Sequence, residues 1–113
     1  NLIILGHSNC GGVEYSYKTL LDKKNINDFE YINQWVSCLQ KSYNNIPNDF
    51  SETEKITYFE QENIKQSIKN LREYDFVDKL INENKLNVIG LWYQINSGLI
   101  KFLDKNNSFI DLD

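Results

Sequence analysis

The spacing of apolar residues changes several times along the chain, and each spacing predicts one kind of element. Leu2–Leu5 is a continuous apolar run that ends at Gly6, the pattern of a strand buried on both faces of a parallel sheet. From Val13 to Leu21 the apolar positions fall on one helical face, which predicts a helix that ends at the polar residues 22–25. The chain therefore opens with a strand followed by a helix.

A second amphipathic helix is expected next. Asn27 is placed to act as its N-cap, with Glu30 three residues later. Apolar residues then recur at alternating intervals of three and four as far as Tyr43. Cys38 lies within this helix beside its apolar face, so we expect it to be a small buried residue.

A third helix is predicted after the loop that holds the only proline. Ser51 and Glu54 have the spacing of a capping box. The apolar stripe that follows is interrupted near Tyr74–Asp75 and resumes to about Asn84. We expect the helix to break there, with Asp75 as the N-cap of its second part.

The last part of the chain reads as strands. Leu86–Ile95 is rich in β-branched and aromatic residues, and a turn signal at 96–98 separates it from an apolar run at Leu99–Leu103. A polar turn then precedes Phe109–Leu112. Strand, helices and strands in this order predict the α/β class, a mostly parallel sheet with flanking helices and a C-terminal hairpin.

Composition and charge limit the possible functions. The chain has 113 residues, enough for one domain at most. A net charge of −4 argues against nucleic-acid binding, and no apolar run approaches the roughly 18–20 residues that span a membrane. Asn, Lys and Ile supply 40 residues, which we interpret as codon bias, so single asparagines carry little information. Because no methionine stands at position 1, we expect the chain to begin inside a longer protein.

One segment combines residues with chemistry. His7 and Cys10 lie between the predicted first strand and first helix, and the carboxyl ends of strands are where open α/β sheets bind ligands. Imidazole and thiolate are both zinc donors, and a helix N-terminus favours the thiolate. Two donors do not complete a tetrahedral site. From spacing alone, the two side chains could equally be ordinary turn residues.

The same segment leads to a family. Residues 3–13, Ile-Ile-Leu-Gly-His-Ser-Asn-Cys-Gly-Gly-Val, closely resemble the second zinc motif of the β-class carbonic anhydrases. Three later segments are similar to other parts of that family in the same order: Gln34-Trp35, the helix at 62–72, and the strand and turn at 88–99. The resemblance covers essentially the whole chain.

The resemblance implies an enzyme, a carbonate dehydratase (a lyase), that interconverts carbon dioxide and bicarbonate at a zinc ion held by Cys, His and Cys. His7 and Cys10 match the second and third ligands, and Gly11 and Gly12 would let the backbone approach the metal pocket. The first Cys and an Asp–Arg pair belong to a C-x-D-x-R motif that is absent here, so the acid–base residues remain unassigned. Residues 1–113 are thus expected to form a single partial domain, the carboxyl-terminal portion, inactive by itself.

The resemblance also implies partners and alternatives. The family forms homodimers or tetramers. Trp35, Trp92 and Tyr93 are expected in the core or at a subunit interface rather than in contact with substrate. Thiol ligands suit the cytoplasm, although an organelle is possible. Neither nucleic acid nor membrane is expected as a partner. The alternatives are a non-catalytic zinc-binding member, a remnant that has lost the metal, and an unrelated α/β domain.

Overall fold

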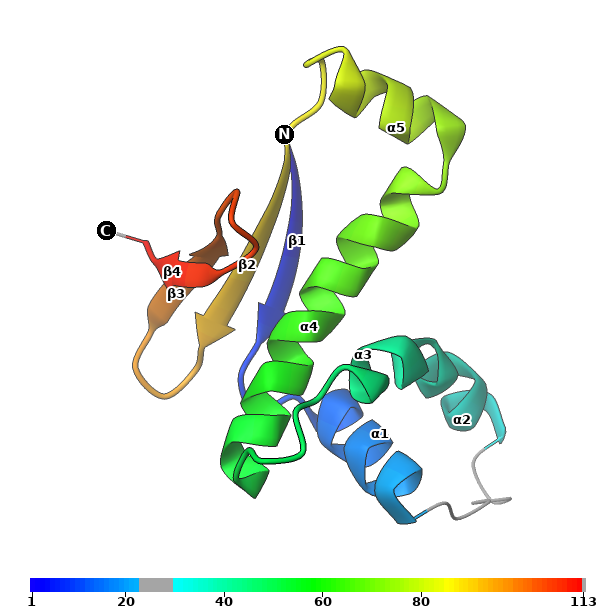
Figure 1. The fold of residues 1–113 in the computed structure, drawn as a ribbon, viewed down its shortest axis with the longest axis vertical. Coiled ribbons are helices and arrows are strands. Elements are labelled where there is room, and N and C mark those ends of the chain that lie inside the picture. The colour runs from blue at the N-terminus through cyan, green and yellow to red at the C-terminus, as the bar shows by residue number, and fades with distance from the viewer. Residues whose placement is uncertain (23–29, 113) are drawn as a thin grey trace.

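The computed structural model describes residues 1–22 and 30–112. The predicted N-cap at Asn27 lies outside the described residues, as do residues 23–25 of the predicted helix end at 22–25. The elements are β1 Leu2–His7, α1 Gly11–Asp22, α2 Glu30–Val36, the 3-10 turn η2 Ser37–Leu39, α3 Gln40–Asn44, α4 Glu52–Arg72, α5 Asp75–Asn82, β2 Val88–Gln94, β3 Leu99–Leu103 and β4 Phe109–Asp111 (Figure 1).

The strands form one sheet in the order β1-β2-β3-β4. β1 and β2 are parallel, with His7 opposite Tyr93 at the end of the pairing. β2 with β3, and β3 with β4, are antiparallel. The α/β class and the C-terminal hairpin are therefore confirmed. Only one of the described pairings is parallel, so the sheet is mixed rather than mostly parallel.

Helix α4 covers one face of β1 and β2 (Figure 1). A Cβ atom on Gly6 would lie 2.7 Å from Cδ1 of Ile64 on α4, so the glycine lies inside the strand and allows the helix to approach. Ile3 and Leu5 point to the opposite face and are 55% and 63% exposed. The prediction that this strand is buried on both faces is wrong for the described residues, because among them the helices lie on one side only.

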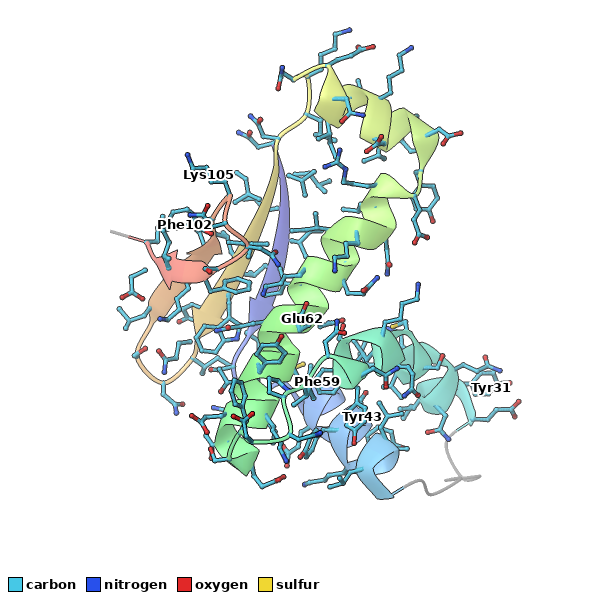
Figure 2. All side chains as sticks on the ribbon, viewed as in Figure 1. Tyr31, Tyr43, Phe59, Glu62, Phe102 and Lys105 are labelled. Atoms are coloured by element: carbon cyan, nitrogen blue, oxygen red, sulfur yellow. The ribbon has the colours of Figure 1, made fainter. Side chains whose placement is uncertain are left out.

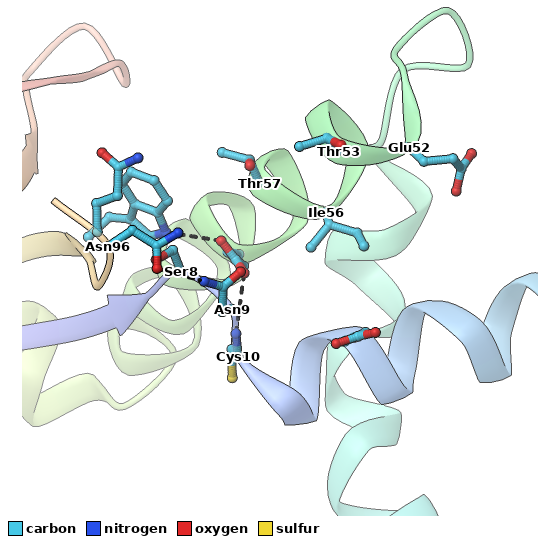
Figure 3. A pocket seen from close by; sticks show the side chains of 12 residues that line it. Ser8, Asn9, Cys10, Glu52, Thr53, Ile56, Thr57 and Asn96 are labelled. Atoms are coloured by element: carbon cyan, nitrogen blue, oxygen red, sulfur yellow. Dashed lines mark hydrogen bonds between the residues drawn. The ribbon is translucent and has the colours of Figure 1, made fainter.

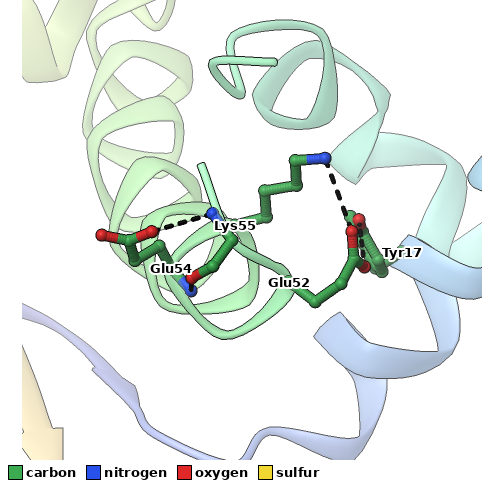
Figure 4. Close-up of polar contacts among 5 residues, drawn as sticks. Tyr17, Glu52, Glu54 and Lys55 are labelled. Atoms are coloured by element: carbon green, nitrogen blue, oxygen red, sulfur yellow. Dashed lines mark hydrogen bonds and ion pairs between the residues drawn. The ribbon is translucent and has the colours of Figure 1, made fainter. Parts of the chain in front are cut away.

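The core lies where α1, α3 and α4 meet. Tyr43 and Phe59 pack with ring centroids 5.9 Å apart (Figure 2), and Phe59 is fully buried. The predicted capping box of α4 is confirmed: the Glu54 backbone N–H donates to Ser51 Oγ at 3.3 Å. The Ser51 N–H donates in return to Glu54 Oε2 at 2.8 Å (Figure 4). The start of the long helix is thus set by its own sequence.

The predicted break between α4 and α5 is confirmed, but Asp75 is not the cap. Tyr74 has the extended backbone of an N-cap, with φ −85° and ψ 114°, and makes no side-chain capping bond. Asp75 is the first helical residue, where a carboxylate favours the positive end of the helix dipole. The helix ends at Asn82.

The second predicted helix is divided into α2, η2 and α3. Val36 and Leu39 are buried, whereas Cys38 is exposed and its thiol donates to the Trp35 carbonyl oxygen at 2.9 Å. The prediction that Cys38 is buried is therefore wrong. Positions two apart on a helical turn do not share a face, so burial of residue 36 directs residue 38 to solvent.

Of the three aromatic residues predicted for the core or an interface, one lies in the core and two are exposed. Trp92 is 4% exposed and belongs to the core. Trp35 and Tyr93 are 67% and 37% exposed, and an interface role for them stays a prediction. None of the described helices is both long enough and apolar enough to cross a membrane.

Candidate metal centre

The turn between β1 and α1 is held against the end of β2 by Ser8, which is 9% exposed. Its backbone N–H donates to the Tyr93 carbonyl oxygen at 2.9 Å, and its Oγ accepts from the Ile95 N–H at 2.9 Å. Both bonds join residues on opposite sides of the parallel pairing. The turn that holds the predicted donors is thereby fixed to the sheet.

Asn9 turns the chain with a left-handed backbone, φ +55°. Asparagine is the residue that tolerates this conformation best after glycine. The Cys10 carbonyl then accepts the first bond of α1, from the Glu14 N–H at 2.9 Å. Cys10 therefore occupies the N-cap position of α1.

The structure places both predicted metal donors on this turn. His7 is exposed at the end of β1, and Cys10 is half-buried with a free thiol. His7 Nδ1 lies 2.9 Å from the Ser8 carbonyl oxygen. When Nδ1 carries the proton it donates to that oxygen, which leaves Nε2 available as a metal ligand.

A cavity of about 440 Å³ opens beside the turn (Figure 3). The backbone nitrogen of Cys10 faces this cavity, whereas its sulfur points the other way (Figure 3). The cavity is lined by residues of the turn, the start of α1, α4, and the end of β2 with a residue beyond it. They are Ser8, Asn9, Cys10, Glu14, Glu52, Thr53, Ile56, Thr57, Glu60, Trp92, Gln94 and Asn96.

Glu60 is the most deeply placed ionisable group of this cavity, at 4% exposed. Oε1 accepts the Cys10 backbone N–H at 3.4 Å, and Oε2 accepts the Trp92 indole N–H at 3.3 Å. Burial raises the pKa of the Glu60 carboxyl, and these two bonds partly oppose the rise. The carboxylate thus links the turn that holds Cys10 to the core strand β2.

Comparison with known proteins assigns the turn to a family. The family model described as carbonic anhydrase matches residues 1–100, a range that includes the whole turn and the sheet strand beside it. The chain belongs to the β-class carbonic anhydrases.

Two curated relatives show the extent of the similarity. A carbonic anhydrase from Helicobacter pylori is 31% identical over 106 residues, which cover 88% of this chain and 47% of that protein. Beta carbonic anhydrase 3 of Arabidopsis thaliana is 30% identical over 101 residues, 87% of this chain and 39% of that protein. The chain therefore spans less than half the length of these relatives.

A solved structure likewise matches this chain over about half of its own length. One of the tetrameric beta-carbonic anhydrases from Sordaria macrospora aligns with a TM-score of 0.71 at 27% identity, covering 89% of this chain and 50% of that chain. The fold of this chain is thus that of a part of a β-carbonic anhydrase.

The donor set fits zinc in kind but is incomplete. Zinc is held by at least three protein ligands, and the described residues contain no group of three His, Cys, Asp or Glu side chains that could hold a metal ion. His7 and Cys10 are residue types that bind zinc, and a zinc site built on them would need at least one further ligand.

The two glycines of the motif have different surroundings. A Cβ on Gly11 would meet no atom within 4 Å, whereas one on Gly12 would lie 3.2 Å from the Trp35 ring. Neither glycine lines the cavity. Their proposed role at the metal pocket stays a prediction, and the structure gives Gly12 a packing role against Trp35.

Sequence analysis singled out neither Asn9 nor Glu60. Asparagine at a turn is a signal for a left-handed backbone, but the abundance of asparagine in this chain obscured it. Glu60 lies 50 positions from Cys10, and only the packing of α4 beside the turn brings the two together.

Proposed function

We propose that the protein containing these residues is a zinc-dependent carbonic anhydrase that catalyses the reversible hydration of carbon dioxide to bicarbonate. The observation that supports this best is the family match over residues 1–100, which includes the turn with His7 and Cys10. Both residue types at that turn are zinc donors, and His7 and Cys10 are proposed as two of the ligands.

Each of the two residues has a defined task. His7 binds as a neutral imidazole through Nε2, with Nδ1 held by the Ser8 carbonyl oxygen. Cys10 binds as a thiolate, which the positive end of the twelve-residue helix α1 favours. Zinc, when bound, supplies the Lewis acidity that activates water near neutral pH.

The remaining parts of the proposed site come from a C-x-D-x-R segment that these 113 residues do not contain. Its Cys would be the third protein ligand, and its Asp and Arg the acid–base pair. Gly11 and Gly12 are proposed to leave room for the backbone at the pocket. We further propose self-association as a homodimer or tetramer and a reducing compartment, by default the cytoplasm.

The test is zinc content and carbon dioxide hydration, measured on the protein expressed from its complete reading frame. Cys10→Ser should lower zinc content from about one ion per chain to a small fraction of that, because one of three protein ligands is removed. Hydration measured by stopped flow should fall with it. Cys38→Ser is the matched control, since Cys38 is exposed and lies outside the cavity beside the turn.

A second candidate is a non-catalytic zinc-binding member of the same family. It would keep His7 and Cys10 as zinc donors but would lack the Cys or the Asp of the C-x-D-x-R segment, which these 113 residues do not contain. Zinc bound through Cys10 without any hydration would support it. Protein that folds with no zinc, and is unaffected by Cys10→Ser, would contradict both candidates.

A further inference from the structure

The start of α1 lacks the residue that normally completes a capped helix. In a capping box, a Glu or Gln at the third helical position accepts the N–H of the N-cap residue. Here the N-cap is Cys10 and the third helical position is Val13, which has no acceptor. The N-terminus of α1 therefore depends on a group from elsewhere for this bond.

Glu60 supplies that group from α4. Its Oε1 accepts the Cys10 N–H at 3.4 Å, the bond that a local capping box would have made. The other oxygen accepts the Trp92 indole N–H at 3.3 Å. The carboxylate is thus shared between the turn and β2.

A carboxylate is the side chain that this arrangement requires. Two N–H groups point at the two terminal oxygens of Glu60, and a carboxylate is acceptor-only at both positions. A Gln at this place would turn its NH2 toward one of the two donors, and the Cys10 N–H, which makes the longer of the two bonds, is expected to lose its acceptor. Burying a carboxylate is costly, and none of the ion pairs found among residues 1–22 and 30–112 involves Glu60. Ordinary packing alone would be served better by an apolar side chain.

We propose that Glu60 is a positioning residue for Cys10. By holding the backbone N–H on the cavity side, it fixes the direction in which the sulfur leaves the turn, on the opposite side of the residue (Figure 3). This inference rests on the proposed function in one respect: that the Cys10 sulfur binds zinc.

The test uses protein from the complete reading frame and two measurements. The first is hydrogen exchange of the Cys10 amide in the metal-free protein. The second is zinc affinity by chelator competition, together with the thiolate-to-metal absorption band of the cobalt(II)-substituted form. Glu60→Gln should speed exchange of the Cys10 amide by about tenfold and weaken zinc binding by about 10- to 100-fold, the range for residues that orient metal ligands.

Two further variants separate positioning from general stability. Trp92→Phe removes the second donor and leaves the carboxylate, so the Cys10 amide should stay protected. Combining it with Glu60→Gln lets the new amide carbonyl face Cys10, so protection should return to that of Trp92→Phe alone. Glu62→Gln is the matched control, because Glu62 is also buried on α4 but pairs with Lys65.

The outcomes are distinct. If Glu60→Gln leaves the Cys10 amide exchange within about twofold of wild type, or if Glu62→Gln changes it equally, the positioning role is wrong. If the wild-type protein binds no zinc, the proposed function fails, while the exchange measurement still decides whether Glu60 holds the turn.

Discussion

Single residues decide the geometry of the turn between β1 and α1, and Asn9 is the most constrained of them. All non-glycine residues with positive φ in the described parts of the chain are asparagines: Asn9, Asn84 and Asn107. A side chain branched at Cβ is disfavoured in that conformation. The turn therefore depends on a residue type that the composition of this chain makes look ordinary.

Asn9→Gly should leave the free energy of unfolding nearly unchanged, because glycine adopts the same backbone without strain. Asn9→Val should lower it by about 1–3 kcal/mol. Urea denaturation measures both. The control is Asn48→Val at an exposed position where φ is not positive, and an equal loss there would contradict the argument.

A residue of the site can be predicted from sequence only when its partners lie close to it along the chain. His7 and Cys10 are three positions apart, and the motif around them is sufficient to identify both. Ser8 is bonded to Ile95, and Glu60 to Cys10 and Trp92. Those contacts form only through the tertiary packing of β2 and α4, which no local pattern encodes.

At the scale of elements, the contact of β1 with α4 depends on the absence of a side chain at Gly6. Gly6→Ala would place a Cβ 2.7 Å from Cδ1 of Ile64. Ile64 is 2% exposed, so its side chain has little room to move aside. We expect a loss of about 1–3 kcal/mol in the free energy of unfolding.

The matched control for that change is Gly11→Ala, where the new Cβ would meet no atom within 4 Å. Gly11 lies in the first turn of α1, so the change should be neutral or stabilising by up to about 1 kcal/mol. Thermal unfolding of the two variants side by side tests the contact. Similar melting temperatures would show that β1 tolerates the added atom.

A contact between α1 and α4, from Tyr17 to Glu52, makes the free energy of unfolding depend on pH. Burial and a hydrogen bond to the Glu52 carboxylate, 2.8 Å long, raise the pKa of Tyr17 to about 12 (Figure 4). The pKa of Tyr17 in the folded protein exceeds its value near 10 in the unfolded chain. The stability that the protonated Tyr17 contributes is therefore complete below pH 10 and is lost as pH rises through 12. Its size is up to about 3 kcal/mol.

Tyr17→Phe should therefore flatten the fall of stability between pH 10 and 12, measured by urea denaturation at each pH. Tyr31→Phe is the control, because Tyr31 is 84% exposed. A fall of the same steepness in the Tyr17→Phe protein would show that other groups cause it.

Elements themselves were predictable where local signals were strong. The capping box at Ser51 and the hairpin after β2 are encoded within a few residues. The division of the second helix into α2, η2 and α3 was not foreseen, because the apolar spacing remains helical through η2. The mixed character of the sheet depends on which strands pair, which apolar runs alone do not specify.

At the scale of the whole molecule, the sheet has an open face opposite α4. By alternation and strand register it is formed by Ile3, Leu5, Ile89, Leu91, Tyr93, Ile100, Phe102 and Ile110. Of these, Ile3 and Leu5 are more than half exposed. Contiguous apolar surface of this kind favours association in water.

The 113-residue chain expressed by itself should therefore self-associate and bind a hydrophobic dye. Leu5→Glu should reduce both, as followed by analytical ultracentrifugation and dye fluorescence. Leu21→Glu is the control, because Leu21 is 52% exposed on α1 and away from the open face. A monodisperse monomer with a sharp, cooperative melt would contradict the prediction.

The bond between Ser8 and Ile95 joins residues 87 positions apart, and this has a consequence for biosynthesis. On the ribosome, β1 emerges long before the strand that pairs with it, and closing so large a loop is entropically costly. Within these 113 residues, the turn with His7 and Cys10 is translated before β2. It cannot reach its native form before β2 and Ile95 have left the exit tunnel, because they supply its tether.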